Sequence, residues 1–183
     1  RRRGGDGAAD ARPARGALHI RRPRAEWTAR FASCLEEPRL YEAALYFDFR
    51  RLGGALGVEP LEDVVTRAAG ERLFLRFLAR EAMEFRPPPS LLLRLQGESS
   101  AVDLRRQGLL PLTALARCYG LEVGSPARGT LERLEAARKA GLLGEEIHAS
   151  ASQAFQFLLG LRLRVELRRT QRGEAPRGEV PLS

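Results

Sequence analysis

The chain has 183 residues and a formal net charge of +8, with 44% hydrophobic and 30% charged residues. This is the composition of a globular domain with its own core. A mean hydropathy of −0.30, with no apolar run near the roughly 18–20 residues of a membrane helix, excludes a membrane-spanning protein. The two cysteines, Cys34 and Cys118, lie far apart in the sequence. They exclude a disulfide-rich miniprotein and indicate reduced thiols in a cytoplasmic protein.

The positive charge is concentrated at the two ends of the chain. Residues 1–24 hold eight arginines against Asp6 and Asp10, a net charge of +6, and residues 161–183 hold six arginines against three glutamates, a net charge of +3. The body between them has a net charge of −1. Lys139 is the only lysine, so the arginine content reflects codon bias as much as selection. The isoelectric point near 10.8 is therefore weak evidence for a nucleic-acid-binding fold.

The sequence divides into an arm, a body and a tail. Residues 1–24 are rich in Gly, Ala, Arg and Pro and have no apolar periodicity, which predicts a basic flexible arm or interdomain linker. Residues 25–173 have helical periodicity and are predicted to form one helical domain. Residues 174–183 are predicted to be a C-terminal tail. The arm could contact RNA or acidic lipid, but a solvated linker is the preferred interpretation.

The first helices are predicted from apolar spacing and from Pro and Gly. Residues 25–37 form an amphipathic segment that Pro38 ends. Residues 40–52 (LYEAALYFDFRRL) contain an aromatic run that could pass for a strand, but the alanine pair favours a helix. The longest predicted helix spans residues 61–85, where Gly70 marks either a close helix crossing or a break. A short apolar stretch follows after three prolines.

The second half of the chain predicts three further helical segments. The run DLRRQGLLPLTALARCYG, which begins at Asp103, contains a helix that starts near Pro111 and stops at Gly120. After a loop, Thr130 is predicted to be the N-cap of the next helix. The last segment, residues 145–169, includes LRLRVEL, which alternates like a strand. Since no turn signal interrupts it, a helix is favoured.

The sum of these elements predicts an all-α protein. It would be a compact helical bundle of about six helices, of up-and-down type, preceded by the flexible N-terminal arm.

The sequence contains no recognisable catalytic or metal-binding motif. His19 and His148 have no His or Cys three or four residues away, and nothing pairs either cysteine with a base. The five aspartates form no DxD pair for Mg²⁺, and no GxGxxG, P-loop or GxSxG motif occurs. The chain by itself is therefore predicted to be neither an enzyme nor a metal protein.

Charged residues embedded in apolar helical segments are the most informative feature. A charge on a buried face must be paired or must face a cavity, and clustered arginines favour phosphate or carboxylate ligands. These residues could line one polar pocket. Alternatively, each belongs to a solvated face or an internal ion pair, with Asp103 as a helix N-cap. The candidate binding residues are Asp48, Arg50, Asp103, Arg105, Arg117, Thr130, Arg133 and Arg162.

The same residues carry a resemblance to a known family. The stretches LYFDFR (45–50), VDLRRQGLLPLTALAR (102–117), TLERLEAARKAGLL (130–143) and FQFLLGLRLRVEL (155–167) occur in that order. In this they resemble the putative nucleotidyltransferase substrate-binding domain. The upstream EWTARFASCLEEP (26–38) is similar to that family's first helix, and Arg105 stands where the family has lysine.

The resemblance implies a helical, non-catalytic substrate-binding or regulatory domain. Such domains follow a nucleotidyltransferase domain similar to that of the PII-protein uridylyltransferase, in bacterial signal-transduction proteins that often add CBS or cyclic-nucleotide-binding domains. Mg²⁺ and a nucleoside triphosphate would be cofactors of the catalytic domain only. The expected partners are that domain of the same protein and an acceptor protein, with no membrane.

On this interpretation, Arg50, Arg105 and Arg117 would meet phosphate or an acidic partner. Two alternatives remain: a helical scaffold for protein–protein interaction without nucleotide contact, and, less favoured, nucleic-acid binding through the arginine-rich ends.

Overall fold

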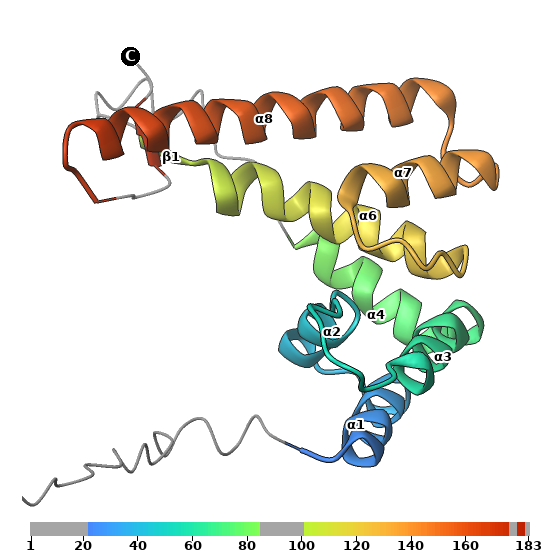
Figure 1. Ribbon diagram of the computed structural model, residues 1–183. Coiled ribbons are helices and arrows are strands. Elements are labelled where there is room, and N and C mark those ends of the chain that lie inside the picture. Colours follow the sequence, from blue (N-terminus) through green and yellow to red (C-terminus); the bar gives the residue numbers. More distant parts are fainter. Residues whose placement is uncertain (1–21, 85–100, 176–178, 182–183) are drawn as a thin grey trace, which may run out of the picture.

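The structure, a computed structural model, describes residues 22–84, 101–175 and 179–181, and most of these residues are helical (Figure 1). The predicted all-α class is confirmed. The elements in chain order are α1 (Arg24–Glu36), α2 (Leu40–Tyr46), α3 (Glu59–Arg67), the 3-10 turn η2 (Ala68–Gly70), α4 (Arg72–Met83), β1 (Ala101–Asp103), the π-helical turn η3 (Arg105–Leu109), α6 (Leu110–Glu122), α7 (Thr130–Lys139), α8 (Glu145–Gln171) and β2 (Glu179–Pro181).

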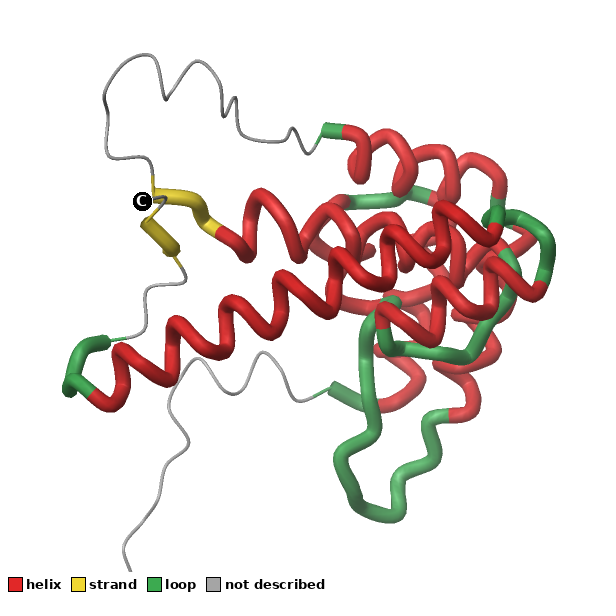
Figure 2. The backbone as a smooth tube through the Cα atoms, turned by 90° about the horizontal axis from the view of Figure 1, so that it is seen from above, coloured by secondary structure: helices red, strands yellow, loops and turns green. Residues whose placement is uncertain are grey.

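The helices form two groups that meet at α6. Helices α1 to α4 lie together at one end of the molecule, and α7 and α8 lie on the other side of α6 (Figure 1). Seen from above, the C-terminal half of α8 extends beyond the other helices (Figure 2). Helix α6 therefore has neighbours on both sides, and side chains on α6 can connect the two groups.

The first core is aromatic and joins α1, α2 and α4. The ring of Phe31 stacks on Tyr46 with 4.8 Å between centroids, and Phe47 packs against Phe74 at 4.7 Å. Phe47 and Phe74 are both fully buried. Leu121 of α6 belongs to the same cluster, so α6 is anchored to this group. Cys34 is buried here as a thiol, as predicted.

The second core is smaller and consists mainly of short side chains. Ala116 of α6, Leu134 and Ala137 of α7, and Ala151 of α8 are buried together. Alanines allow helix backbones to approach closely, which suits the close packing of α6 against α7. Farther along α8, Leu158 lies against Gly108 of η3, where an added Cβ would be 2.8 Å from the Leu158 Cδ1 atom. Here the absence of a side chain lets α8 approach the turn.

Helix α2 is shorter than predicted. It ends at Tyr46 rather than continuing to residue 52. Successive helix positions differ by about 100°. If α2 continued, Phe47 and Phe49 would therefore point about 160° apart, and they could not both reach the core that contains Tyr46. Leaving the helix after Tyr46 allows Phe47 to be fully buried and Phe49 to pack 5.4 Å from the Phe31 ring. The polar residues that follow α2 therefore lie in a loop.

The segment predicted as the longest helix is two helices. Helix α3 ends at Arg67, and η2 ends at Gly70, before α4 starts at Arg72. The alternative that Gly70 marks a break is therefore confirmed, and the single helix over residues 61–85 is wrong. The longest helix is instead α8, with 27 residues. Its period-2 stretch is helical, as predicted.

Two helix ends also differ from the predictions. Gly120 lies inside α6, which continues to Glu122, and the positive φ of 63° occurs at Gly124. The N-cap of α7 is Gly129, so Thr130 is the first helical residue rather than the cap. In the predicted tail, β2 pairs antiparallel with β1, with Val102 opposite Val180. Residues 1–21 of the predicted arm (1–24) and the apolar stretch 90–95 lie outside the described residues, and Arg24, the last residue of the predicted arm, is the first residue of α1.

Candidate functional site

Asp48 occupies the centre of the candidate site. It lies in the loop after α2, between the buried Phe47 and the half-buried Phe49, and its side chain is 28% exposed. Because Phe47 and Phe49 fix the backbone on either side, the carboxylate has a defined direction. It points to Arg117 of α6 and Arg133 of α7, which lie 69 and 85 residues farther along the chain.

Two arginines bind this carboxylate. Arg117 of α6 donates both Nε and Nη2 to Asp48 Oδ2, with 3.0 Å from Nε, and Arg133 of α7 donates Nη1 to Asp48 Oδ1 at 2.5 Å. The Arg133 side chain is only 2% exposed and that of Arg117 13%. We call Asp48, Arg117 and Arg133 the Asp48 cluster. It joins the two groups of helices by charge-assisted hydrogen bonds.

Arg133 has further partners in both flanking loops. Its Nη2 donates to the Phe47 carbonyl at 2.8 Å, and its Nε donates to the Ala127 carbonyl at 2.9 Å. The guanidinium is thus bonded to the loop after α2 and to the loop before α7. Removing one partner of such a buried pair typically costs about 3–5 kcal/mol, because the other charge remains buried.

Gly120 explains how so large a side chain is accommodated. A Cβ at this position would lie 2.6 Å from Arg133 Cγ and 3.0 Å from its Cβ and Cδ. The aliphatic part of Arg133 therefore crosses α6 in the space that a side chain would fill. The glycine that the sequence suggested as a stop signal is required for this close approach.

The cluster keeps Asp48 ionised. Burial by itself would raise the pKa of this carboxyl, but the hydrogen bond and charge of Arg117, with the charge of Arg133, outweigh it and hold the pKa below its usual value. The carboxylate therefore stays paired at neutral pH and serves to orient the two guanidiniums.

A hollow of about 450 Å³ opens beside the cluster; we call it the Arg50 hollow. It lies between the loop after α2, the start of α7 and the middle of α8. Arg50 at its edge donates Nη2 to the Arg128 carbonyl at 3.3 Å. The lining residues are Asp48, Arg50, Thr113, Arg128, Gly129, Thr130, Leu131, Glu132 and Phe155.

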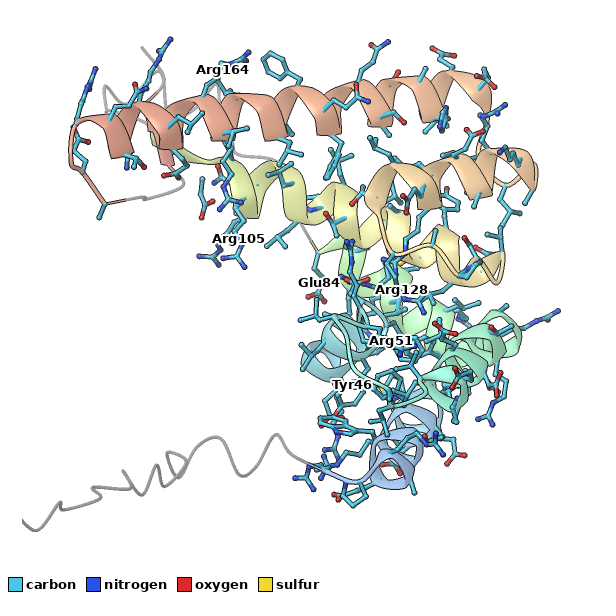
Figure 3. The ribbon with its side chains drawn as sticks, in the orientation of Figure 1. Tyr46, Arg51, Glu84, Arg105, Arg128 and Arg164 are labelled. Carbon is cyan, nitrogen blue, oxygen red and sulfur yellow. The ribbon has the colours of Figure 1, made fainter. Side chains whose placement is uncertain are left out.

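Arg128 is the second cation of the hollow. Its guanidinium carbon lies 5.2 Å from the centre of the Phe49 ring, so the aromatic core holds the side chain in place (Figure 3 labels Arg128 and the nearby Arg51). Burial first, and then the charge of Arg133, lower the pKa of Arg128, although Glu62 and Asp48 act in the opposite direction. The lowered pKa therefore reflects mainly the burial of this guanidinium.

The charges around the hollow can be counted directly. The hollow itself is lined by two arginines, Arg50 and Arg128, and by two carboxylates, Asp48 and Glu132. Arg117 and Arg133 are bonded to Asp48 from behind, so the region has a surplus of positive charge. Glu132 is itself occupied, since its Oε2 accepts from the Gly129 N–H at 3.2 Å.

The structure brings five of the eight candidate residues together. Asp48, Arg117 and Arg133 form the cluster, and Arg50 and Thr130 line the adjoining hollow. The sequence left two alternatives, internal ion pairs or one shared polar pocket. The structure has both, next to each other.

The other three candidates lie elsewhere. The Asp103 Oδ1 atom accepts from the Arg105 and Arg106 N–H groups, both at 3.0 Å, which is the N-capping alternative. The Arg105 side chain lines a separate pocket that Arg117 also lines. Arg162 is half-buried on α8 and lines neither of these spaces.

Sequence reasoning missed Arg128, Thr113 and Phe49. The useful signal for Arg128 was its position just before a predicted helix start, where an arginine lies close to the first N–H groups of the helix. Thr113 gave no signal, since a threonine inside an apolar helix is usually a packing residue.

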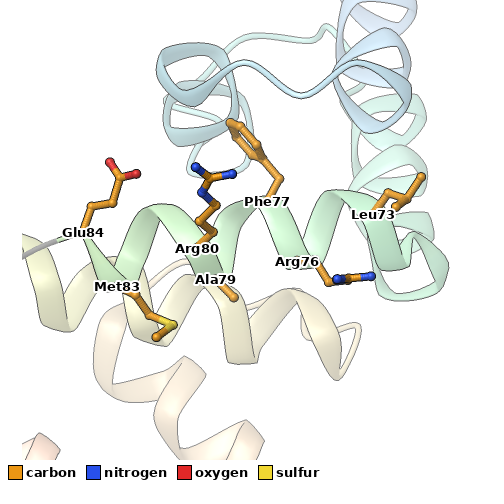
Figure 4. A pocket seen from close by; sticks show the side chains of 7 residues that line it. All are labelled: Leu73, Arg76, Phe77, Ala79, Arg80, Met83 and Glu84. Carbon is orange, nitrogen blue, oxygen red and sulfur yellow. The ribbon is translucent and has the colours of Figure 1, made fainter.

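A wider hollow of about 900 Å³ lies over α4, but it contains none of the candidate residues. Its lining side chains all come from α4 and the following Glu84 (Figure 4). Among the described residues, no group of three or more His, Cys, Asp and Glu side chains lies close enough to hold a metal ion. No helix in the described ranges has both the length and the apolar character of a membrane span.

The fold and site define an α-helical domain with a cationic hollow held by a buried ion-pair cluster. The sequence pattern of the putative nucleotidyltransferase substrate-binding domain matches residues 72–183, well over half of the chain, and the protein belongs to that family. Neither the curated proteins nor the solved structures include a match.

The family match begins at the start of α4. Arg117, Thr130 and Arg133 lie inside it, whereas Asp48 and Arg50 lie before it. The resemblance over residues 25–71 thus remains a prediction. Direct bonds from Asp48 to Arg117 and Arg133 nevertheless make the preceding loop part of the same site.

Proposed function

We propose that this chain is the non-catalytic substrate-binding and regulatory domain of a nucleotidyltransferase of the PII-uridylyltransferase type, acting in bacterial signal transduction. The Arg50 hollow would hold the phosphates of the nucleotide or an acidic segment of the acceptor. The catalytic domain of the same protein would supply the Mg²⁺ site and the transfer chemistry.

The observation that carries this proposal is the surplus of guanidinium groups beside a preorganised cluster. Asp48 fixes Arg117 and Arg133, Phe49 supports Arg128, and Arg50 remains at the exposed edge. An arginine fork binds phosphate oxygens in two-point geometry, and the first N–H groups of α7 adjoin the same hollow. An oxyanion is the ligand that this arrangement fits best.

The structure suggests different roles within the set. Arg50 and Arg128 line the hollow and would contact the ligand. Arg117 and Arg133 are already bonded to Asp48, so we propose that they support the site from behind rather than bind phosphate. Thr130 would contribute its hydroxyl or backbone N–H at the start of α7.

Nucleoside triphosphate binding tests the proposal. Titration calorimetry with UTP and ATP should show binding to the full chain, and Arg50→Ala should weaken it by roughly tenfold, the loss typical of a charge-assisted hydrogen bond. Arg168→Ala, an exposed arginine near the end of α8, is the matched control and should bind as the unmodified chain does. Equal affinity of Arg50→Ala and Arg168→Ala would contradict nucleotide contact at this hollow.

The scaffold alternative makes a different prediction. A partner protein would bind whether or not Arg50 and Arg128 are present, and nucleotide would not compete with it. Convergence of five charged and polar candidates at one place favours the ligand-binding interpretation. The nucleic-acid alternative depends mainly on residues 1–24, most of which lie outside the described residues.

A further inference from the structure

A second pocket lies on the other side of the Asp48 cluster, between α2, α4 and α6. It has a volume of about 410 Å³, which falls in the range of about 300–1,000 Å³ typical of small-molecule sites. Most of its lining is apolar or small, and comes from Ala44, Leu78, Ala82, Leu110, Ala114 and Cys118. We call it the Cys118 pocket.

Three charged residues lie at this pocket. Arg105 and Arg117 are cations and Glu81 is the single anion. Arg117 is bonded to Asp48, whereas Arg105, the first residue of η3, is exposed (Figure 3). An occupant therefore meets an apolar interior, with the exposed guanidinium of Arg105 on η3 and the carboxylate of Glu81 on α4 beside it.

The cysteine in the wall does not add reactivity. Burial raises the pKa of the Cys118 thiol to about 11, so the sulfur is protonated at neutral pH and is a weak nucleophile. A protonated thiol behaves as a small apolar group with a polarizable sulfur. The pocket thus offers packing surface and no covalent chemistry.

We propose that the Cys118 pocket binds a small amphipathic anion, that is, an aromatic or branched aliphatic body with one carboxylate, sulfonate or similar group. The body would fill the space between Leu78 and Ala114, and the anion would face Arg105. This site is distinct from the Arg50 hollow, and it does not depend on the function proposed for that hollow. The two share Thr113 as a common wall, so an occupant would lie against the Arg117–Asp48 ion pair.

The test uses 1-anilinonaphthalene-8-sulfonate, a fluorescent aromatic sulfonate, with the full chain. We expect saturable binding of one molecule per chain. Arg105→Gln should weaken it by roughly fivefold, the upper value for a partly exposed ion pair. The matched control is Arg106→Gln, which removes the same charge from the neighbouring exposed residue, outside the pocket lining. Equal affinities of these two variants would overturn the proposal.

Two further measurements distinguish the contribution of the ligand's apolar body from that of its anionic group. N-phenyl-1-naphthylamine has nearly the same body without the sulfonate and should bind more weakly; equal affinity would overturn the anionic part. Ala114→Phe should fill the pocket and abolish binding. If Ala114→Phe keeps the native circular dichroism spectrum and still binds the probe, the site is elsewhere, for example on the exposed leucines of α8. If it fails to fold, the pair of arginine variants decides the question.

Discussion

Asp48 and Glu135 each bind more than one cation, but in different surroundings. Asp48 is bonded to Arg117 and Arg133, whose side chains are nearly buried and come from distant parts of the sequence. Glu135 is bonded to Arg138 and Lys139, three and four residues along the same helix, and its Oε2 lies 3.3 Å from His148 Nε2. We call the second set the Glu135 cluster.

The difference shows that the number of ion pairs is a poor measure of their contribution to the stability of the fold. Ion pairs within one helix that remain partly exposed, such as Glu135 with Arg138, typically contribute a few tenths of a kcal/mol, since water and salt screen them. In the Asp48 cluster the two arginine side chains are 13% and 2% exposed and come from separate helices, so losing a partner leaves charge in poorly hydrated surroundings.

The largest effect is expected when Arg133 is replaced. Arg133→Met keeps much of the apolar length but removes the bonds to Asp48, Phe47 and Ala127, and should lower the free energy of unfolding by about 3–5 kcal/mol. The control is Arg138→Met, on the same helix, which removes two ion pairs where Arg133→Met removes one. Urea unfolding should show only a small effect for the control. Similar losses for both variants would contradict the comparison.

The next largest effect is expected for a substitution that tests the close approach of Arg133 to α6. Gly120→Ala should destabilise the fold by about 1–3 kcal/mol, because a Cβ would overlap the Arg133 side chain, whose guanidinium is held in place. Gly160→Ala, inside α8 with no atom near the added Cβ, should instead be stabilising by up to about 1 kcal/mol. Thermal unfolding of both variants shows whether each substitution raises or lowers the melting temperature. A stabilising Gly120→Ala would mean that Arg133 has room to move.

These cases show how much the sequence could predict. Helical periodicity and the prolines and glycines were enough for the all-α class and for most helices, because those signals are local. Spacing of three or four residues can also predict pairs such as Glu135 with Arg138. The bonds from Asp48 to Arg117 and Arg133 depend on how α6 and α7 pack against the loop after α2, and no local pattern specifies that packing.

The end of α2 and the role of Gly120 were mispredicted for a related reason. The alanine pair favours a helix although the aromatic run could pass for a strand, but burying Phe47 and Phe49 in one core requires the chain to leave the helix. A glycine is a common helix stop signal, which is why the sequence predicted that α6 ends at Gly120. The position of Arg133 on the neighbouring helix α7 explains why a glycine is needed inside α6. In both places a tertiary contact outweighs the local preference.

Lower pH should weaken the Asp48 cluster. Because the pKa of Asp48 is lowered in the folded state, its contribution is present above the unfolded value of about 3.9 and is lost as the pH falls through the folded value. Asp48→Asn should therefore differ most from the unmodified chain near neutral pH, and the difference should shrink in acid. Asp63→Asn, on the exposed side of α3, is the control. A gap between Asp48→Asn and the unmodified chain that is independent of pH would contradict this linkage.

The smallest effect is expected at Glu135. The hydrogen bond from Arg138, more than the charges of Arg138 and Lys139, holds the pKa of Glu135 at about 2, so its contribution is present above the unfolded pKa and disappears as the pH falls toward 2. Glu135→Gln should lower the melting temperature slightly at neutral pH, and about 1 M NaCl should reduce the difference because charges that are partly exposed are screened. The control is Glu146→Gln on α8, which is exposed and outside this cluster. If salt left the Glu135 effect unchanged, this cluster would be as well shielded from water as that of Asp48, and the contrast between them would fail.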